Sequence, residues 1–346
     1  MTPILPMMQE EGLSLSEGGW LAAANYLGYL AGALSTIWLR LNASVAIRAA
    51  LLAIGLSTLA MGLVDGFASW LALRALAGVA SAWVLVFVSA WTLERLAEKR
   101  RPQLAGVLYA GVGTGVAAAG IFCLLVVRAD ASWIGLGAIA LVAAGATWPA
   151  FSFQHGARGE KRTDAPSGGW LLILCYGAYG FGYIVPATFL PAMARQIVAD
   201  PPAFGSAWPV LGIAAAGSTL IASRLGATNP RRVWVICMLL LALGVAAPLL
   251  VPGLAGILLS AVLVGATFVT ITLAGMQEAR RIYGAAARPV MAAMTAAFAV
   301  GQLIGPVLVA LAQEIPQGFT IVLVTATAGL LVSAAALTQW PRGRSG

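Results

Sequence analysis

Apolar runs of about 20 residues recur along the chain, separated by short polar connections. A run of this length crosses about 30 Å of hydrocarbon as an α-helix, and the lack of polar alternation favours helices over strands. The run 169–190 is the clearest, because it contains no charged residue. The pattern predicts full membrane helices at 20–39, 45–64, 67–91, 104–127, 133–153, 169–193, 207–225, 233–251, 254–277, 290–313 and 319–340.

The second half of the chain repeats features of the first half at an offset of 185 to 187 residues. Leu190-Pro191-Ala192-Met193 resembles Leu5-Pro6-Met7-Met8, and Arg288-Pro289 repeats Arg101-Pro102. Two glycine pairs, Gly32 with Gly217 and Gly78 with Gly265, follow the same spacing. Such a repeat predicts two similar helical halves, 1–153 and 168–346, joined by the polar linker 154–167.

Composition indicates a membrane protein, because 60% of the residues are hydrophobic and 9% are charged. In lipid every backbone amide must be paired internally, so long apolar runs form helix bundles. By the repeat offset, the partner of the helix at 169–193 would start before Met1. We therefore expect an all-α polytopic membrane protein, a twelve-helix bundle in two six-helix halves, whose first helix is truncated to residues 1–8.

The basic residues are distributed unevenly among the connections. Alternate connections and the tail hold 17 of the 20 lysines and arginines, namely Arg40, Arg48, Arg95, Lys99, Arg100, Arg101, Arg158, Lys161, Arg162, Arg224, Arg231, Arg232, Arg280, Arg281, Arg288, Arg342 and Arg344. This is the positive-inside pattern, and it predicts that the linker and both termini are cytoplasmic. The net charge of +8 does not form a patch, so we expect a lipid bilayer and no nucleic acid as partner.

Arg74 lies well inside a predicted helix, about 10 Å from its outer end at roughly 1.5 Å per residue. An intramembrane arginine usually faces a cavity or a partner, although its long side chain can also snorkel to the interface. We predict that Arg74 is the charge in a solute or proton path.

Polar side chains form stripes on otherwise apolar helices. Asn25 and Tyr29 share one face of the helix at 20–39, Tyr179 and Tyr183 lie on the helix at 169–193, and Thr267 lies on the helix at 254–277. These groups should face either a solute path or another helix, so substrate contact and interhelical hydrogen bonding both stay open.

Two helices carry small residues at four-residue spacing. Gly111 and Gly115 lie on the helix at 104–127, and Gly301, Gly305 and Pro306 lie on the helix at 290–313. Such spacing is typical of close helix packing, and a Gly-Pro break can also serve as a hinge.

The chain offers little chemistry for catalysis or metal binding. Cys123, Cys175 and Cys237 lie in apolar runs without metal-ligand spacing, and His155 is alone in a loop. No acid lies well inside a predicted helix. We therefore expect no enzyme activity, no metal and no cofactor.

Two six-helix repeats, a central linker and Arg74-x-x-x-Gly78 resemble the major facilitator superfamily. Three segments, 2–6, 28–32 and 181–191, are similar to bacterial YbfB/YjiJ-type transporters. Neither 32–48 nor 224–232 contains an acidic residue, so the superfamily's usual gating salt bridge is not expected there.

The resemblance implies a secondary active transporter of a small solute in the bacterial inner membrane. It also implies alternating access, with protons as one option for the coupling ion. The alternative is a non-transporting membrane sensor or assembly protein that uses a transporter fold.

Overall fold

The computed structural model describes residues 3–39, 41–126, 128–151, 169–197, 207–226, 229–312 and 315–339, and within these ranges there is no strand. Eight helical stretches of the described chain are long and apolar enough to cross a membrane. The prediction of an all-α membrane protein is therefore confirmed. At the start of the chain, α1 (Leu5–Glu10) has only six residues.

The remaining helices follow the predicted order. Those of the first half are α2 (Leu15–Trp38), α3 (Ala43–Ala60), α4 (Phe67–Trp83), α5 (Ser89–Glu98), α6 (Ala105–Leu125) and α7 (Ala129–Thr147). Those of the second half are α8 (Trp170–Ile197), α10 (Ala207–Gly226), α11 (Pro230–Leu250), α12 (Leu254–Tyr283), α13 (Ala287–Ala312) and α14 (Gly318–Gln339).

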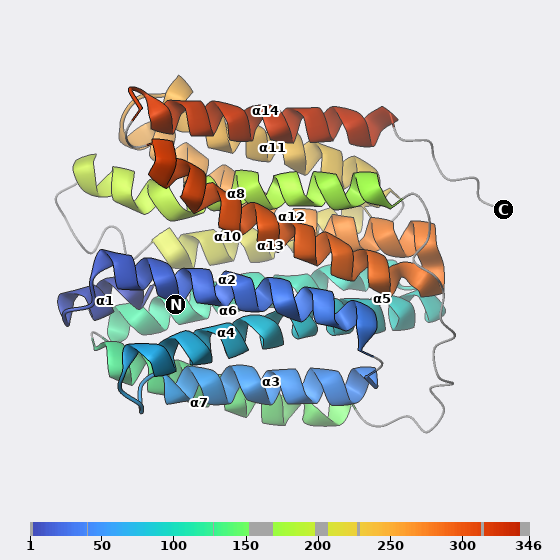
Figure 1. The fold of residues 1–346 in the computed structure, drawn as a ribbon. Coiled ribbons are helices and arrows are strands. Elements are labelled where there is room, and N and C mark those ends of the chain that lie inside the picture. The colour runs from blue at the N-terminus through green and yellow to red at the C-terminus, as the bar shows by residue number, and fades with distance from the viewer. Residues whose placement is uncertain are drawn as a thin grey trace.

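The helices lie roughly side by side, with the first half in the lower part of Figure 1 and the second half in the upper part. Within the halves, α2 packs on α4 and α3 on α7, while α8 packs on α13 and α11 on α12. Between the halves, α6 packs on α10 and α2 on α13, and we call these two contacts the seam. The predicted repeat relates α2 to α10 and α6 to α13, so it exchanges the two seam contacts.

The bounds of the two halves stay a prediction, and the linker 154–167 lies outside the described residues. One boundary inside the first half was placed too late: α2 begins at Leu15 rather than at residue 20. Ser14 explains the early start, because its hydroxyl accepts a hydrogen bond from the Glu17 amide at 3.2 Å while the Glu17 carboxylate accepts one from the Ser14 amide at 2.9 Å. This capping box starts the helix before the apolar run begins.

Two helices also end later than hydrophobicity alone predicts. The stretch that begins with α4 continues through a π-helical turn, Val84–Val88, into α5 and ends at Glu98 rather than at residue 91. Similarly, α12 continues to Tyr283 rather than ending at residue 277. Polar residues extend both helices beyond the apolar run, since an α-helix needs its backbone hydrogen bonds and not apolar side chains to continue.

Glycine allows the closest backbone approach within the first half, where α2 crosses α4. A Cβ atom added at Gly78 would clash with the carbonyl oxygen of Asn25, and one added at Gly28 would clash with that of Ala75. Gly111 of α6 is the opposite case, because no described atom lies within 4 Å of an added Cβ. Helix contact therefore constrains Gly78 and leaves Gly111 free.

We expect Gly78→Ala to lower the melting temperature in detergent by several degrees, because overpacking costs about 1–3 kcal/mol. Gly111→Ala is the matched control. It should leave the melting temperature unchanged or raise it slightly, since alanine favours a helix over glycine by about 1 kcal/mol. Equal melting of the two variants would contradict the close α2–α4 crossing.

Candidate functional site

Arg74 is buried inside the bundle, with 9% of its surface exposed. Its guanidinium lies over the ring of Trp133, 5.5 Å from the ring centroid. Its Nε has no hydrogen-bond partner, and no described residue forms an ion pair with Arg74. The side chain therefore stays inside the protein rather than snorkelling to the interface.

This environment makes Arg74 an unusual charge. Burying a cation without an acceptor costs several kcal/mol, whereas a cation–π contact returns about 2 kcal/mol at most. The guanidinium therefore retains a strong tendency to bind an anion or a hydrogen-bond acceptor.

Three of the predicted polar residues use their polar groups to join or stabilise helices. The Asn25 side-chain amide donates to the Arg74 carbonyl oxygen at 3.1 Å, which connects α2 to α4. The Tyr179 hydroxyl donates to the Phe268 carbonyl oxygen at 2.6 Å, which connects α8 to α12. The Thr267 hydroxyl donates to the Leu263 carbonyl of its own helix at 2.7 Å. Their contact with a substrate stays a prediction, and the hydrogen bonds supply a structural role.

Aromatic side chains gather at the seam. Tyr183 stacks on Phe268 with 4.9 Å between ring centroids and 19° between ring planes, and Tyr179 lies 4.9 Å from Phe298. Tyr26 of the first half interacts electrostatically with both Arg74 and Tyr183. Among the described residues, no hydrogen bond is made by the hydroxyls of Tyr26, Tyr29 or Tyr183. Together with Arg74, these three tyrosines form the seam site.

The predicted glycines divide into two groups. In α13, an added Cβ at Gly301 would clash with the Gly177 carbonyl of α8, and one at Gly305 would clash with the Ile184 side chain. Gly111 and Gly115 face open space among the described residues, and Gly113 instead makes the close seam contact with α10. Pro306 lies inside α13 without ending it, so its role as a hinge stays a prediction.

The halves also touch at the end of the bundle where α5 and α12 finish, which we call the basic end. Arg280 lies 3.8 Å from the Glu94 carboxylate, and the Gln277 side chain donates to the Pro102 carbonyl at 3.4 Å. The Arg288 guanidinium lies 5.4 Å from the centroid of Phe87, which belongs to the π-helical turn. These contacts hold the basic end of the seam together.

Glu278 organises the second half at this end. It is fully buried and accepts hydrogen bonds at 2.7 Å from Arg231 of α11 and from Arg281 of its own helix. The sequence analysis missed it, because the predicted helix stopped at residue 277. The expectation that an acid was needed within 224–232 overlooked a partner 47 residues away. A carboxylate three residues before Arg281 at a helix end was the available signal.

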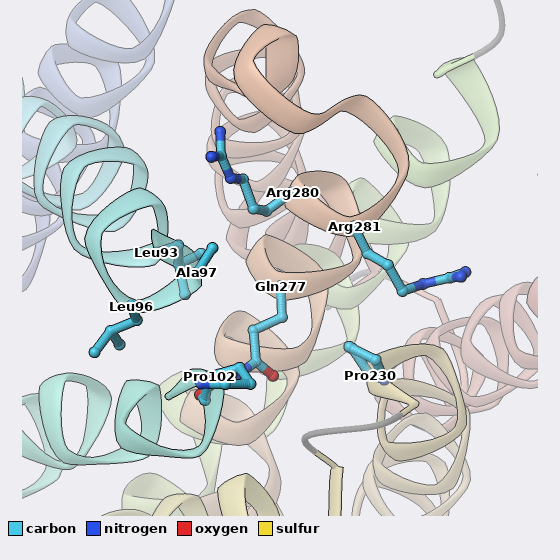
Figure 2. Close-up of a pocket in the computed structure, with 8 residues that line it drawn as sticks. All are labelled: Leu93, Leu96, Ala97, Pro102, Pro230, Gln277, Arg280 and Arg281. Carbon is cyan, nitrogen blue, oxygen red and sulfur yellow. Dashed lines mark hydrogen bonds between the residues drawn. The ribbon is translucent and has the colours of Figure 1, made fainter. Parts of the chain in front are cut away.

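Figure 2 shows a pocket of about 160 Å³ between these contacts. One side is formed by Leu93, Leu96 and Ala97 of α5. Gln277 points toward Pro102, while Arg280 and Arg281 extend away from each other. The pocket is small and largely apolar, so the basic end is packed nearly closed.

The described part of the chain contains no group of three histidine, cysteine or acidic residues that could hold a metal ion. Cys123, Cys175 and Cys237 are buried free thiols. The chemistry of the site therefore rests on Arg74, the seam tyrosines and the charged groups of the basic end.

Comparison with solved structures shows a similar fold in the crystal structure of the human organic anion transporter MFSD10 (TETRAN). The TM-score is 0.73 at 16% sequence identity, covering 92% of this chain and 83% of that chain. At this identity the likeness concerns the fold alone. Comparison with curated proteins gives no match.

The family described as "Uncharacterised MFS-type transporter YbfB" matches residues 1–338. Its fold and family are those of transporters, and they agree with the helices and the seam described above. The chain therefore belongs to the YbfB-type family of major facilitator transporters.

Proposed function

We propose that this protein is a secondary active transporter that moves a small solute across the bacterial inner membrane by alternating access. The observation that carries the proposal is the buried, unpaired Arg74 beside three tyrosine hydroxyls at the seam. A cation with free phenol groups suits a solute that carries an acidic or other acceptor group. Membership of a transporter family supports this assignment.

In this proposal the basic end faces the cytoplasm, as the positive-inside pattern predicts. Contacts between Glu94 and Arg280 and between Gln277 and Pro102 then close the cytoplasmic side of the solute path. The halves must separate at these contacts when they rock to release or admit solute on that side. The state described is therefore closed toward the cytoplasm.

The orientation predicts a difference in cysteine labelling in intact cells. In a variant whose three buried cysteines are replaced by alanine, Asp65→Cys should react with a membrane-impermeant maleimide. Lys99→Cys should react only after the cells are opened, because it lies at the basic end. The reverse pattern would place the basic end outside the cell.

Arg74→Ala should slow solute uptake by about tenfold or more, since a lost charged hydrogen bond is worth about 1.5–3 kcal/mol. The measurement uses proteoliposomes under an imposed proton gradient and a defined mixture of amino acids, sugars, nucleosides and organic acids, followed by mass spectrometry. Arg128→Ala is the matched control, because Arg128 is exposed and paired with Asp130.

Unchanged uptake by Arg74→Ala, with protein amounts matched, would remove Arg74 from the mechanism. A protein that changes conformation while no solute of the mixture crosses the membrane would support the sensor alternative instead.

Glu94→Gln should raise the ratio of open to closed molecules at the basic end by about twofold to fivefold, because an exposed ion pair contributes about 0.2–1 kcal/mol. The ratio can be measured by electron–electron distance spectroscopy between spin labels at Lys99→Cys and Ala285→Cys. Glu98→Gln, one turn further along α5, is the control. Identical distance distributions in Glu94→Gln and Glu98→Gln would show that the Glu94–Arg280 pair does not hold the halves.

A further inference from the structure

A pocket of about 440 Å³ lies at the opposite end of the first half, which we call the acidic end. It is bounded by α1, the start of α2, the connection between α3 and α4, and the start of α7. The lining combines four carboxylates with aromatic side chains, and it contains Glu11, Glu17, Asp65, Asp130, Trp70 and Trp133. No lysine or arginine is among the described residues that line it.

The carboxylates are held in place and charged. Hydrogen bonds from the Ser14 hydroxyl and amide lower the pKa of Glu17, which keeps this group ionised at neutral pH. The Glu11 carboxylate accepts a hydrogen bond from the Ala129 amide at 3.0 Å, which fixes it against the start of α7. Acidic groups beside apolar walls concentrate field lines and attract cations.

The inner wall of the pocket offers a hydrogen-bond donor. Trp133 is 2% exposed, and its indole Nε1 has no acceptor. Trp70 differs, because its indole N–H donates to the Val64 carbonyl at 2.8 Å. A buried donor without an acceptor costs about 1–3 kcal/mol, and an acceptor on a bound molecule would remove this cost. This unsatisfied donor is independent of the acidic rim and also points to a ligand.

The two ends of the pocket prefer opposite charges. The carboxylates favour a cation at the rim, whereas the Arg74 guanidinium on the Trp133 ring disfavours a cation deeper inside. A ligand should therefore place its positive group outward and its acceptor inward. The volume is within the range of about 300–1,000 Å³ that is usual for small-molecule sites.

We propose that this pocket binds an organic ammonium compound that also carries a hydrogen-bond acceptor. The ammonium group lies among Glu11, Glu17 and Asp65, where Trp70 adds an aromatic face for it. The acceptor receives the N–H of Trp133. Binding of this kind does not depend on the proposed transport, since it uses only residues of the first half.

Acetylcholine is a suitable probe, because it joins a quaternary ammonium to an ester carbonyl. Two relatives separate its features: choline keeps the charge without the ester, and 3,3-dimethylbutyl acetate keeps the ester without the charge. Titration calorimetry on the purified protein at low salt should show acetylcholine binding at least about tenfold more tightly than either relative.

Variants assign the two contacts. The double variant Glu11→Gln, Asp65→Asn should weaken acetylcholine binding by about tenfold, whereas Glu98→Gln at the basic end should leave it unchanged. Trp133→Phe should weaken acetylcholine by about fivefold and choline hardly at all, because choline lacks the ester acceptor. Trp234→Phe is the matched control, since Trp234 is also buried with an unpaired indole nitrogen but lies outside the pocket.

Equal binding of acetylcholine and 3,3-dimethylbutyl acetate, or no binding of acetylcholine, would overturn the proposal. Equal effects of Trp133→Phe and Trp234→Phe would overturn the assigned donor. The ligand comparison uses the unaltered protein, so a variant that fails to fold does not prevent a decision. Because binding is measured without solute flux, this proposal and the transport proposal can fail separately.

Discussion

The cost of leaving polar groups unpaired in hydrocarbon is the constraint on which this structure depends. Backbone amides meet it by forming helices, and charged side chains meet it by gathering at the helix ends. Glu278 shows the rule at the basic end, where two arginines surround a fully buried carboxylate. Arg74 is an exception among the described residues, because it is buried with an aromatic ring and no acid as its neighbour. An exception to such a rule is where a function is expected.

The seam combines tight and weak contacts. Along α6 and α10, Gly113 brings the backbones together, so the middle of the seam is closely packed. At the basic end the halves are joined by a half-exposed ion pair and by a hydrogen bond of 3.4 Å. Contacts of the second kind can break at little cost, because water replaces them readily. This division allows the halves to separate at one end while they stay packed at the centre.

The predicted helix ends failed in an informative way. Hydrophobicity marks where the chain leaves the lipid, and it does not mark where the helix ends. Ser14 and Glu17 start α2 in a polar segment, and Glu278 with Arg281 prolongs α12 beyond the apolar run. Residues of these polar ends, including Glu94 and Glu278, make the contacts that the sequence analysis missed. Among the glycines, spacing alone did not separate Gly111 from Gly113, because only the direction of each Cα determines which one meets a neighbour.

The sequence by itself determined the class of the protein, the order of its helices and the importance of Arg74. These follow from the length of apolar runs and from the rarity of a charge within them, which are local properties of the chain. Only the tertiary structure decided which polar groups are already paired. Asn25, Tyr179 and Thr267 looked equivalent to Tyr29 and Tyr183 until their partners 4 to 89 residues away were known. Hydrogen bonding at a seam depends on which helices meet, and that is fixed by packing across the whole bundle rather than by any one segment.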